Sequence, residues 1–125
     1  MDRKLVVLIA TGAIKYRDLF PRSEYEDIIV EFSRYQAREP KLWNHPASTS
    51  YREIVVCDSH VVTSLTQRRV ANYLRNEYGL CGEMRLAASV ASTLGWKFQD
   101  YVILDNQLVK KSEASQPHRQ YSFLR

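Results

Sequence analysis

The stretch SLTQRRVANYLRNEYGLCGEMRLAASVASTLGWKFQDYVILDNQLVKK, residues 64–111, carries most of the information about the fold. Ser64 is a favourable N-cap residue, and Gly79 suits the position just beyond a helix end, so a helix is expected between them. Apolar side chains at helical spacing predict its buried stripe: Val70, Tyr73, Leu74 and Tyr78. The opposite face of this helix is basic, which leaves it open to solvent or to an anionic partner.

A second helix is expected to begin at Glu83 and to end at Gly95. Four apolar positions in this segment recur at heptad-like spacing: Met84, Ala88, Ala91 and Leu94. The segment contains many Ala and Ser residues, so the helix would be thin and would allow its neighbours to approach closely.

Two strands are expected at the end of this stretch, over residues 97–104 and 107–111. Asp105 and Asn106 lie between them, and both residue types tolerate the positive φ angles of a tight hairpin. Two helices followed by a hairpin are the order of a winged helix-turn-helix. The second half of the chain is therefore predicted to resemble that motif.

The first half of the chain predicts a strand, a helix and a second strand. Residues 5–10 form a continuous β-branched apolar run, which is typical of a strand covered on both faces. Ser23 and Glu26 have the spacing of a capping box, so a helix is expected over residues 24–37. Residues 53–57 form the second strand. This order favours a right-handed unit with parallel strands, although the long loop before residue 53 also permits antiparallel pairing.

These elements predict a single α/β or α+β domain with the order β-α-β-α-α-β-β. The chain has 125 residues and 45% apolar content, which suits one compact core. The domain is expected to span residues 1–111, and residues 112–125 are expected to form a polar, flexible tail.

The charge and the cysteines give further expectations. The chain has 18 Lys and Arg against 14 Asp and Glu, a formal charge of +4, which favours an anionic partner. Cys57 and Cys81 lack the spacing of a metal site, so neither a metal nor another cofactor is expected. No apolar run is long enough to span a membrane, so no membrane partner and a cytoplasmic location are expected.

The leading hypothesis is a small, possibly regulatory nucleic-acid-binding protein. Helix arginines would contact phosphates, small hydroxyl residues would approach base edges, and lysines would lie in the wing. The residues concerned are Arg68, Arg75, Arg85, Ser89, Ser92, Thr93, Lys97, Lys110 and Lys111. A homodimer would follow if a helix-turn-helix binds paired half-sites. The simpler interpretation is that these arginines only solvate an exposed helix face.

A second hypothesis comes from the edge of the predicted parallel sheet. Thr11 and Gly12 follow the first strand, and Asp58, Ser59 and His60 follow the second, so the two groups should meet at one edge. A hydroxyl, a carboxylate and an imidazole there could serve a small hydrolase or nuclease. The simpler interpretation is that polar residues close a strand and begin a turn.

A third hypothesis is a protein-binding adaptor or inhibitor. Eight of the fourteen aromatic residues are Tyr, and several lie near Arg or Lys in the sequence. Tyr and Arg are enriched at protein interfaces, because both combine a large contact area with hydrogen bonding.

Overall fold

The computed structural model of the chain describes residues 3–31 and 40–114, which form one mixed sheet with few helices. The strands are β1 (Lys4–Ile9), β2 (Tyr25–Glu31), β3 (Lys41–Leu42), β4 (Ser50–Val61), β5 (Cys81–Ala91), β6 (Tyr101–Leu104) and β7 (Gln107–Lys110). The helices are α1 (Leu65–Tyr78) and α2 (Thr93–Trp96), with 3-10 turns η1 (Ile14–Leu19) and η2 (Lys111–Glu113).

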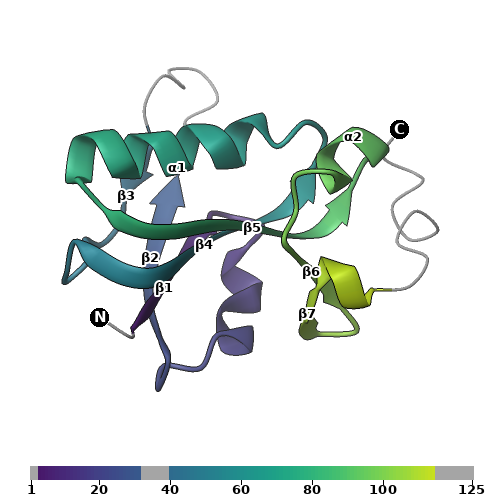
Figure 1. Cartoon of the computed structure of the whole chain (residues 1–125), viewed down its shortest axis with the longest axis horizontal. Helices are drawn as coiled ribbons and strands as arrows, with labels where there is room; N and C mark the ends of the chain where they lie inside the picture. Colours follow the sequence, from purple (N-terminus) through teal and green to yellow (C-terminus); the bar gives the residue numbers. More distant parts are fainter. Residues whose placement is uncertain (1–2, 32–39, 115–125) are drawn as a thin grey trace.

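The seven strands lie in the order β3-β2-β1-β4-β5-β6-β7. The five central strands are parallel, and β3 and β7 are antiparallel additions at the two edges. Helix α1 covers one face of the sheet and η1 lies on the other (Figure 1). This arrangement confirms the predicted α/β class.

Strand β1 is the centre of the core, as its continuous apolar run predicted. Leu5, Val7 and Ile9 pack in the cluster that includes α1, whereas Val6 and Leu8 pack in the cluster on the opposite face. All five side chains are buried. Because successive side chains of a strand point to opposite faces, a strand covered on both sides must be apolar throughout.

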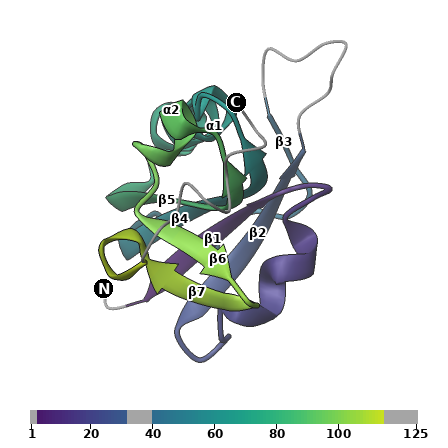
Figure 2. The same ribbon diagram turned by 90° about the vertical axis from the view of Figure 1, so that its right-hand side faces the viewer.

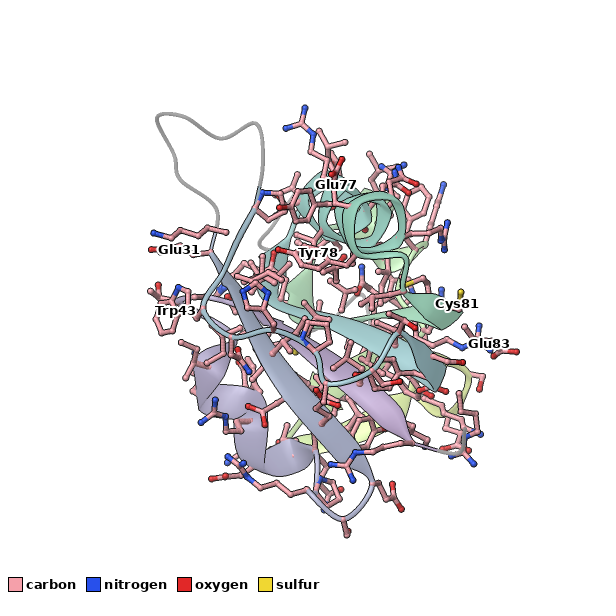
Figure 3. All side chains as sticks on the ribbon, turned by 90° about the vertical axis from the view of Figure 1, so that its left-hand side faces the viewer. Glu31, Trp43, Glu77, Tyr78, Cys81 and Glu83 are labelled. Atoms are coloured by element: carbon pink, nitrogen blue, oxygen red, sulfur yellow. The ribbon has the colours of Figure 1, made fainter. Side chains whose placement is uncertain are left out.

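Helix α1 has the ends that the sequence predicted. Ser64 occupies the N-cap position, and Gly79 ends the helix with a φ of 62°. Val70 and Leu74 are buried against the sheet, and Tyr73 and Tyr78 pack against the same core while remaining partly exposed. Figure 3 shows Tyr78 beneath the helix and Glu77 directed toward solvent.

The helix expected over residues 24–37 is wrong. Residues 25–31 form strand β2, which pairs with β1 in parallel so that Val7 lies opposite Ile28. The run Ile28, Ile29 and Val30 is buried, and β-branched side chains suit a buried strand. Residues 32–37 of the expected helix lie outside the described residues. The strand expected at residues 53–57 does pair in parallel with β1, as part of the longer β4.

The helix expected from Glu83 to Gly95 is also wrong, and the winged helix-turn-helix with it. Residues 81–91 form β5, which pairs in parallel with β4 over most of its length. Ala87, Ala88 and Ala91 are fully buried in this strand. Small apolar residues on both faces of a buried strand leave no two-residue alternation, so periodicity alone cannot distinguish the strand from a buried helix.

The C-terminal hairpin is confirmed at its turn, although its first strand is shorter than expected. Residues 93–96 form α2, and the first strand, β6, begins only at Tyr101. Asp105 and Asn106 have φ angles of 49° and 59°, as a tight two-residue hairpin turn requires. Figure 2 looks onto the hairpin, with α1 and α2 together on one side of the sheet.

Candidate functional site

The strand order places a candidate site at the carboxyl ends of β1 and β4. From β1 the chain passes to β2 on one side, whereas β4 pairs with β1 on its other side. In open parallel sheets, ligands bind in the crevice where the strand order reverses in this way. Two loops begin at this edge, residues 10–13 after β1 and the β4–α1 loop, which comprises residues 62–64.

The two polar groups that the sequence predicted to meet do so at this edge. Gly12 lies so close to β4 that a Cβ atom at this position would stand 2.2 Å from Ser59 Oγ. Thr11 is exposed beside it. Ser59 Oγ lies 3.2 Å from His60 Nδ1. The structure therefore brings Thr11, Ser59 and His60 into one neighbourhood.

A pocket of about 190 Å³ opens beside this contact, under the N-terminus of α1. Asp58 and His60 line it together with residues 61–67. Side chains alternate along β4, so Asp58 and His60 share the face that α1 covers, and Ser59 points the other way. The pocket thus combines a carboxylate, an imidazole and the first turn of a helix.

The first turn of α1 borders this pocket. Ser64 has a φ of 66°, and in the described part of the chain its side chain caps none of the N–H groups of that turn. Leu65 N donates to Thr63 Oγ1 at a long distance of 3.3 Å. The N-terminal N–H groups of a helix have no partner within the helix, and the helix dipole makes this end positive. Such an end is suited to bind an anion.

Burial alters the acidity of Asp58. Desolvation raises the pKa of this carboxyl, while a hydrogen bond from Ser59 N at 2.8 Å and the proximity of His60 act in the opposite direction. A carboxylate kept in a half-buried pocket can accept hydrogen bonds from ligand hydroxyl groups. Across residues 3–31 and 40–114, no group of three or more His, Cys, Asp or Glu side chains comes together in a way that could hold a metal ion.

Six of the nine residues predicted to bind nucleic acid line two adjoining depressions. Arg68 and Arg75 lie on α1 beside a depression that includes Phe98. A second depression, which shares Phe98 and Asp100 with the first, is lined by Arg85, Lys97, Lys110 and Lys111. The remaining three lie apart from both: Ser89 in β5, Ser92 buried before α2, and Thr93 at the start of α2.

Several of these cations have partners within the chain. The Arg68 guanidinium lies 4.5 Å from the centre of the Phe98 ring and donates to Thr63 O at 3.0 Å. Arg85 pairs with Glu83 and, at 3.9 Å, with Asp100. Lys111 Nζ donates to two backbone carbonyls. These contacts favour the simpler interpretation, in which the basic residues stabilise the fold.

Four residues of the loop and of the buried layer beneath it were not predicted from the sequence: Thr63, Thr66, Gln67 and Gln99. Gln67 lies three residues before Val70 and seven before Leu74, so a polar residue occupies the apolar stripe of α1. A glutamine in such a position is the signal that could have identified it, because buried amides require hydrogen-bond partners.

The described helices, all within residues 3–31 and 40–114, include none with the length and apolar character needed to cross a bilayer. Neither a family model nor a curated protein sequence matches this chain.

Solved structures of similar fold include purine phosphoribosyltransferases. Hypoxanthine phosphoribosyltransferase from Staphylococcus aureus has a TM-score of 0.55 and 13% identity, over 83% of this chain and 57% of that one. Purine phosphoribosyltransferase from Pyrococcus horikoshii has a TM-score of 0.56 and 13% identity, over 80% and 69%. The Trypanosoma cruzi hypoxanthine enzyme has a TM-score of 0.55 and 14% identity, over 82% and 61%.

These likenesses show a shared fold, and the chain spans 57% to 69% of the length of these three neighbours. They overturn the predicted nucleic-acid-binding regulator, because the fold is that of purine phosphoribosyltransferases and the expected recognition helix is strand β5. The adaptor and the hydrolase or nuclease alternatives are set aside with it. The expected homodimer loses its basis, since it depended on the helix-turn-helix. What the comparisons establish is a phosphoribosyltransferase-like α/β fold.

Proposed function

We propose that this protein binds the phosphate group of a phosphorylated ribose compound, such as a nucleoside 5′-monophosphate, at the β4–α1 loop. The observation that carries the proposal is the uncapped N-terminus of α1 opening onto a pocket at the switch point of the sheet. In the phosphate complex, the N–H groups of the first turn of α1 donate to phosphate oxygens. The hydroxyl groups of Thr63 and Thr66, both exposed at the pocket, add neutral donors.

The size of the pocket limits what it can hold. Pockets that enclose a drug-sized ligand have volumes of roughly 300–1,000 Å³, whereas this one has about 190 Å³. It therefore suits a phosphate with part of a sugar, and a purine base would lie outside it. Asp58 adds to this preference, because its carboxylate accepts hydrogen bonds from ribose hydroxyls but repels a bare phosphate.

The fold neighbours support this class of ligand. They are phosphoribosyltransferases for purines, and one Trypanosoma cruzi structure, with a TM-score of 0.55, is described as complexed with the product IMP. IMP is therefore the first compound to test.

Isothermal titration calorimetry with IMP, ribose 5-phosphate, inorganic phosphate and inosine tests the proposal. IMP and ribose 5-phosphate should bind, and inosine, which lacks the phosphate, should not. Thr66→Val should weaken the binding of IMP and of ribose 5-phosphate. Thr49→Val, at an exposed position before β4 and away from the pocket, should not. Equal binding of inosine and IMP, or no binding of any phosphate compound, would overturn the proposal.

Asp58→Asn separates the sugar from the phosphate. Removal of the negative charge should strengthen the binding of inorganic phosphate, because like-charge repulsion is lost. The preference for ribose 5-phosphate over inorganic phosphate should decrease, because an amide replaces the carboxylate acceptor. An unchanged preference would show that Asp58 does not contact the ribose.

Transfer of a phosphoribosyl group to a purine base is a second candidate function. It is favoured by the position of His60, an exposed imidazole beside Asp58 in the pocket. In such a transfer the bond from ribose C1 to a diphosphate leaving group breaks, a C1–N bond to the purine forms, and His60 accepts the proton of that nitrogen. Formation of IMP from hypoxanthine and 5-phosphoribosyl diphosphate in magnesium-containing buffer tests it, with loss of product in His60→Ala as the expected result.

A further inference from the structure

We infer that Gln99 is a positioning residue that holds the β4–α1 loop in its ligand-binding conformation, acting through Gln67 and Ser64. The inference rests on the proposed function, since it assigns a cause to the geometry of the phosphate site. None of these three residues has an exposed side chain: Gln67 is 0% exposed, Gln99 is 1% and Ser64 is 3%.

Gln67 and Gln99 form a reciprocal amide pair between α1 and the segment before β6. Gln67 Nε2 donates to Gln99 Oε1 at 3.0 Å, and Gln99 Nε2 donates to Gln67 Oε1 at 2.8 Å. Gln67 Nε2 also donates to Ala87 O of β5 at 2.9 Å. Burial of an amide is costly unless its groups are hydrogen-bonded, so this pair fixes both side chains in one arrangement.

The pair extends directly to the β4–α1 loop. Gln99 Nε2 donates to Ser64 Oγ at 3.0 Å, and Gly95 O, at 3.2 Å, shares its two hydrogens as a third, longer acceptor. Ser64 Oγ in turn donates to the same carbonyl at 3.3 Å. Ser64 has a left-handed φ of 66°, which is uncommon for any residue with a Cβ atom. The hydrogen bond from Gln99 therefore stabilises a backbone conformation that Ser64 would otherwise leave.

A second set of contacts holds the start of the same loop. Ser92 Oγ donates to Val62 O and accepts a hydrogen bond from Gly95 N at 3.0 Å. Ser92 N donates to Val61 O at 2.9 Å. Residues 92–99, which we call the α2 segment, thus contact the loop at both of its ends, and Gln99 provides the contact next to α1.

The conformation of Ser64 decides where the first N–H groups of α1 point. A ligand that binds a preformed set of donors does not lose affinity to the ordering of the loop. When Gln99 can no longer donate, Ser64 is free to leave the left-handed region and the donors lose their common direction. Loss of the contacts from Gln99 Nε2 to Ser64 Oγ and Gly95 O should weaken the binding of ribose 5-phosphate by about tenfold.

The experiment compares Gln99→Met, the double variant Gln67→Met with Gln99→Met, and the control Gln107→Met. Gln107 is an exposed glutamine at the start of β7. Gln99→Met alone leaves the Gln67 amide without its partner, which destabilises the fold; replacing both amides removes that penalty. Both Gln99 variants should bind ribose 5-phosphate about tenfold more weakly than the unmodified protein, and the control should match it.

A second measurement separates positioning from stability. Amide hydrogen exchange of Arg68, whose N–H donates to Ser64 O at 2.9 Å, is followed by NMR without ligand and should be faster in the double variant, while exchange in β1 and β4 stays unchanged. If the exchange of Arg68 and the affinity both stay unchanged in a folded double variant, the inference is overturned. If Gln99→Met fails to fold, the affinity and amide exchange of the double variant alone test the inference.

Failure of the proposed function gives a different result. In that case the unmodified protein does not bind ribose 5-phosphate, yet faster exchange of the Arg68 amide in the double variant would still show that Gln99 holds the loop. Binding by the unmodified protein with identical affinity and exchange in the double variant would overturn the role of Gln99 alone.

Discussion

Gly12 and Ser59 are in direct contact across the carboxyl edge of the sheet, where a Cβ atom on Gly12 would stand 2.2 Å from Ser59 Oγ and 3.0 Å from Ser59 Cβ. This contact joins the loop after β1 to the end of β4 and fixes one side of the candidate site. It has no room for a methyl group.

Gly12→Ala should therefore destabilise the protein by about 1–3 kcal/mol, the usual cost of overpacking. Combining it with Ser59→Ala removes the hydroxyl that the new methyl group meets, so the double variant should lose less stability than the sum of the two single variants. Urea unfolding of all four proteins measures the coupling. Additive losses would show that the two residues do not share this space.

Gly95→Ala tests how closely α2 packs on the β4–α1 loop. A Cβ atom there would meet Val62 O at 2.9 Å and Val61 O at 3.0 Å, and backbone atoms cannot rotate away. Ala is favoured over Gly within a helix by about 1 kcal/mol, so helix propensity and packing oppose each other. We expect packing to prevail, with a net loss of about 1–3 kcal/mol in the free energy of unfolding. An increase in stability would contradict this contact.

Ser64→Gly tests the balance between backbone strain and the hydrogen bond from Gln99. Glycine should relieve about 1 kcal/mol of strain at a φ of 66°, but it removes the Oγ acceptor, which contributes about as much. Ser64→Gly alone should therefore change the free energy of unfolding little. In the Gln99→Met background, where the hydrogen bond is already absent, the same change should stabilise the protein. Equal effects in both backgrounds would contradict the coupling.

Asp58→Asn should raise the melting temperature at neutral pH. Burial raises the pKa of Asp58 in the folded protein above its ordinary value of 3.8. As the pH rises from 3.8 through the folded pKa, the unfolded chain releases this proton first, so the stability provided by the protonated carboxyl is lost. Asn carries no charge and avoids that loss. Melting curves from pH 3 to pH 8 should show the advantage of the variant only above about pH 4, and Asp18→Asn, at an exposed site, serves as the control.

The two cysteines should differ sharply in reactivity. Cys57 is fully buried in β4, and desolvation, together with the charge of Asp58, raises the pKa of its thiol to about 12. Cys81 is exposed at the start of β5, where Figure 3 shows it at the edge of the molecule near Glu83. Because the thiolate is the reactive form, Ellman's reagent should detect one thiol in the folded protein and a second after unfolding. Cys81→Ser should abolish the reaction of the folded protein with the reagent. Rapid reaction of both thiols in the folded protein would contradict this assignment.

The polar edge of the site could be predicted from the sequence, because it depends only on which strands end next to one another. Once residues 5–10 and 53–57 are assigned to neighbouring parallel strands, Gly12 and Asp58 must lie at the same edge. The α1 end of the site was partly predicted too, through Ser64 as an N-cap. The pair of Gln67 and Gln99 was not, since the two residues are 32 positions apart and neither has a local signal of its partner.

Local chemistry determined β1, α1 and the C-terminal hairpin, because a continuous β-branched run, a glycine beyond a helix end and an Asp-Asn turn each specify a conformation within a few residues. Only the tertiary structure decided that residues 25–31 and 81–91 are strands. Both are covered on two faces by the rest of the chain, and burial on both faces removes the alternation that distinguishes a strand from a helix. Their pairing with β1 and β4 supplies the backbone hydrogen bonds that fix them as strands, and the candidate site at the carboxyl edge of the sheet exists only after that pairing has formed.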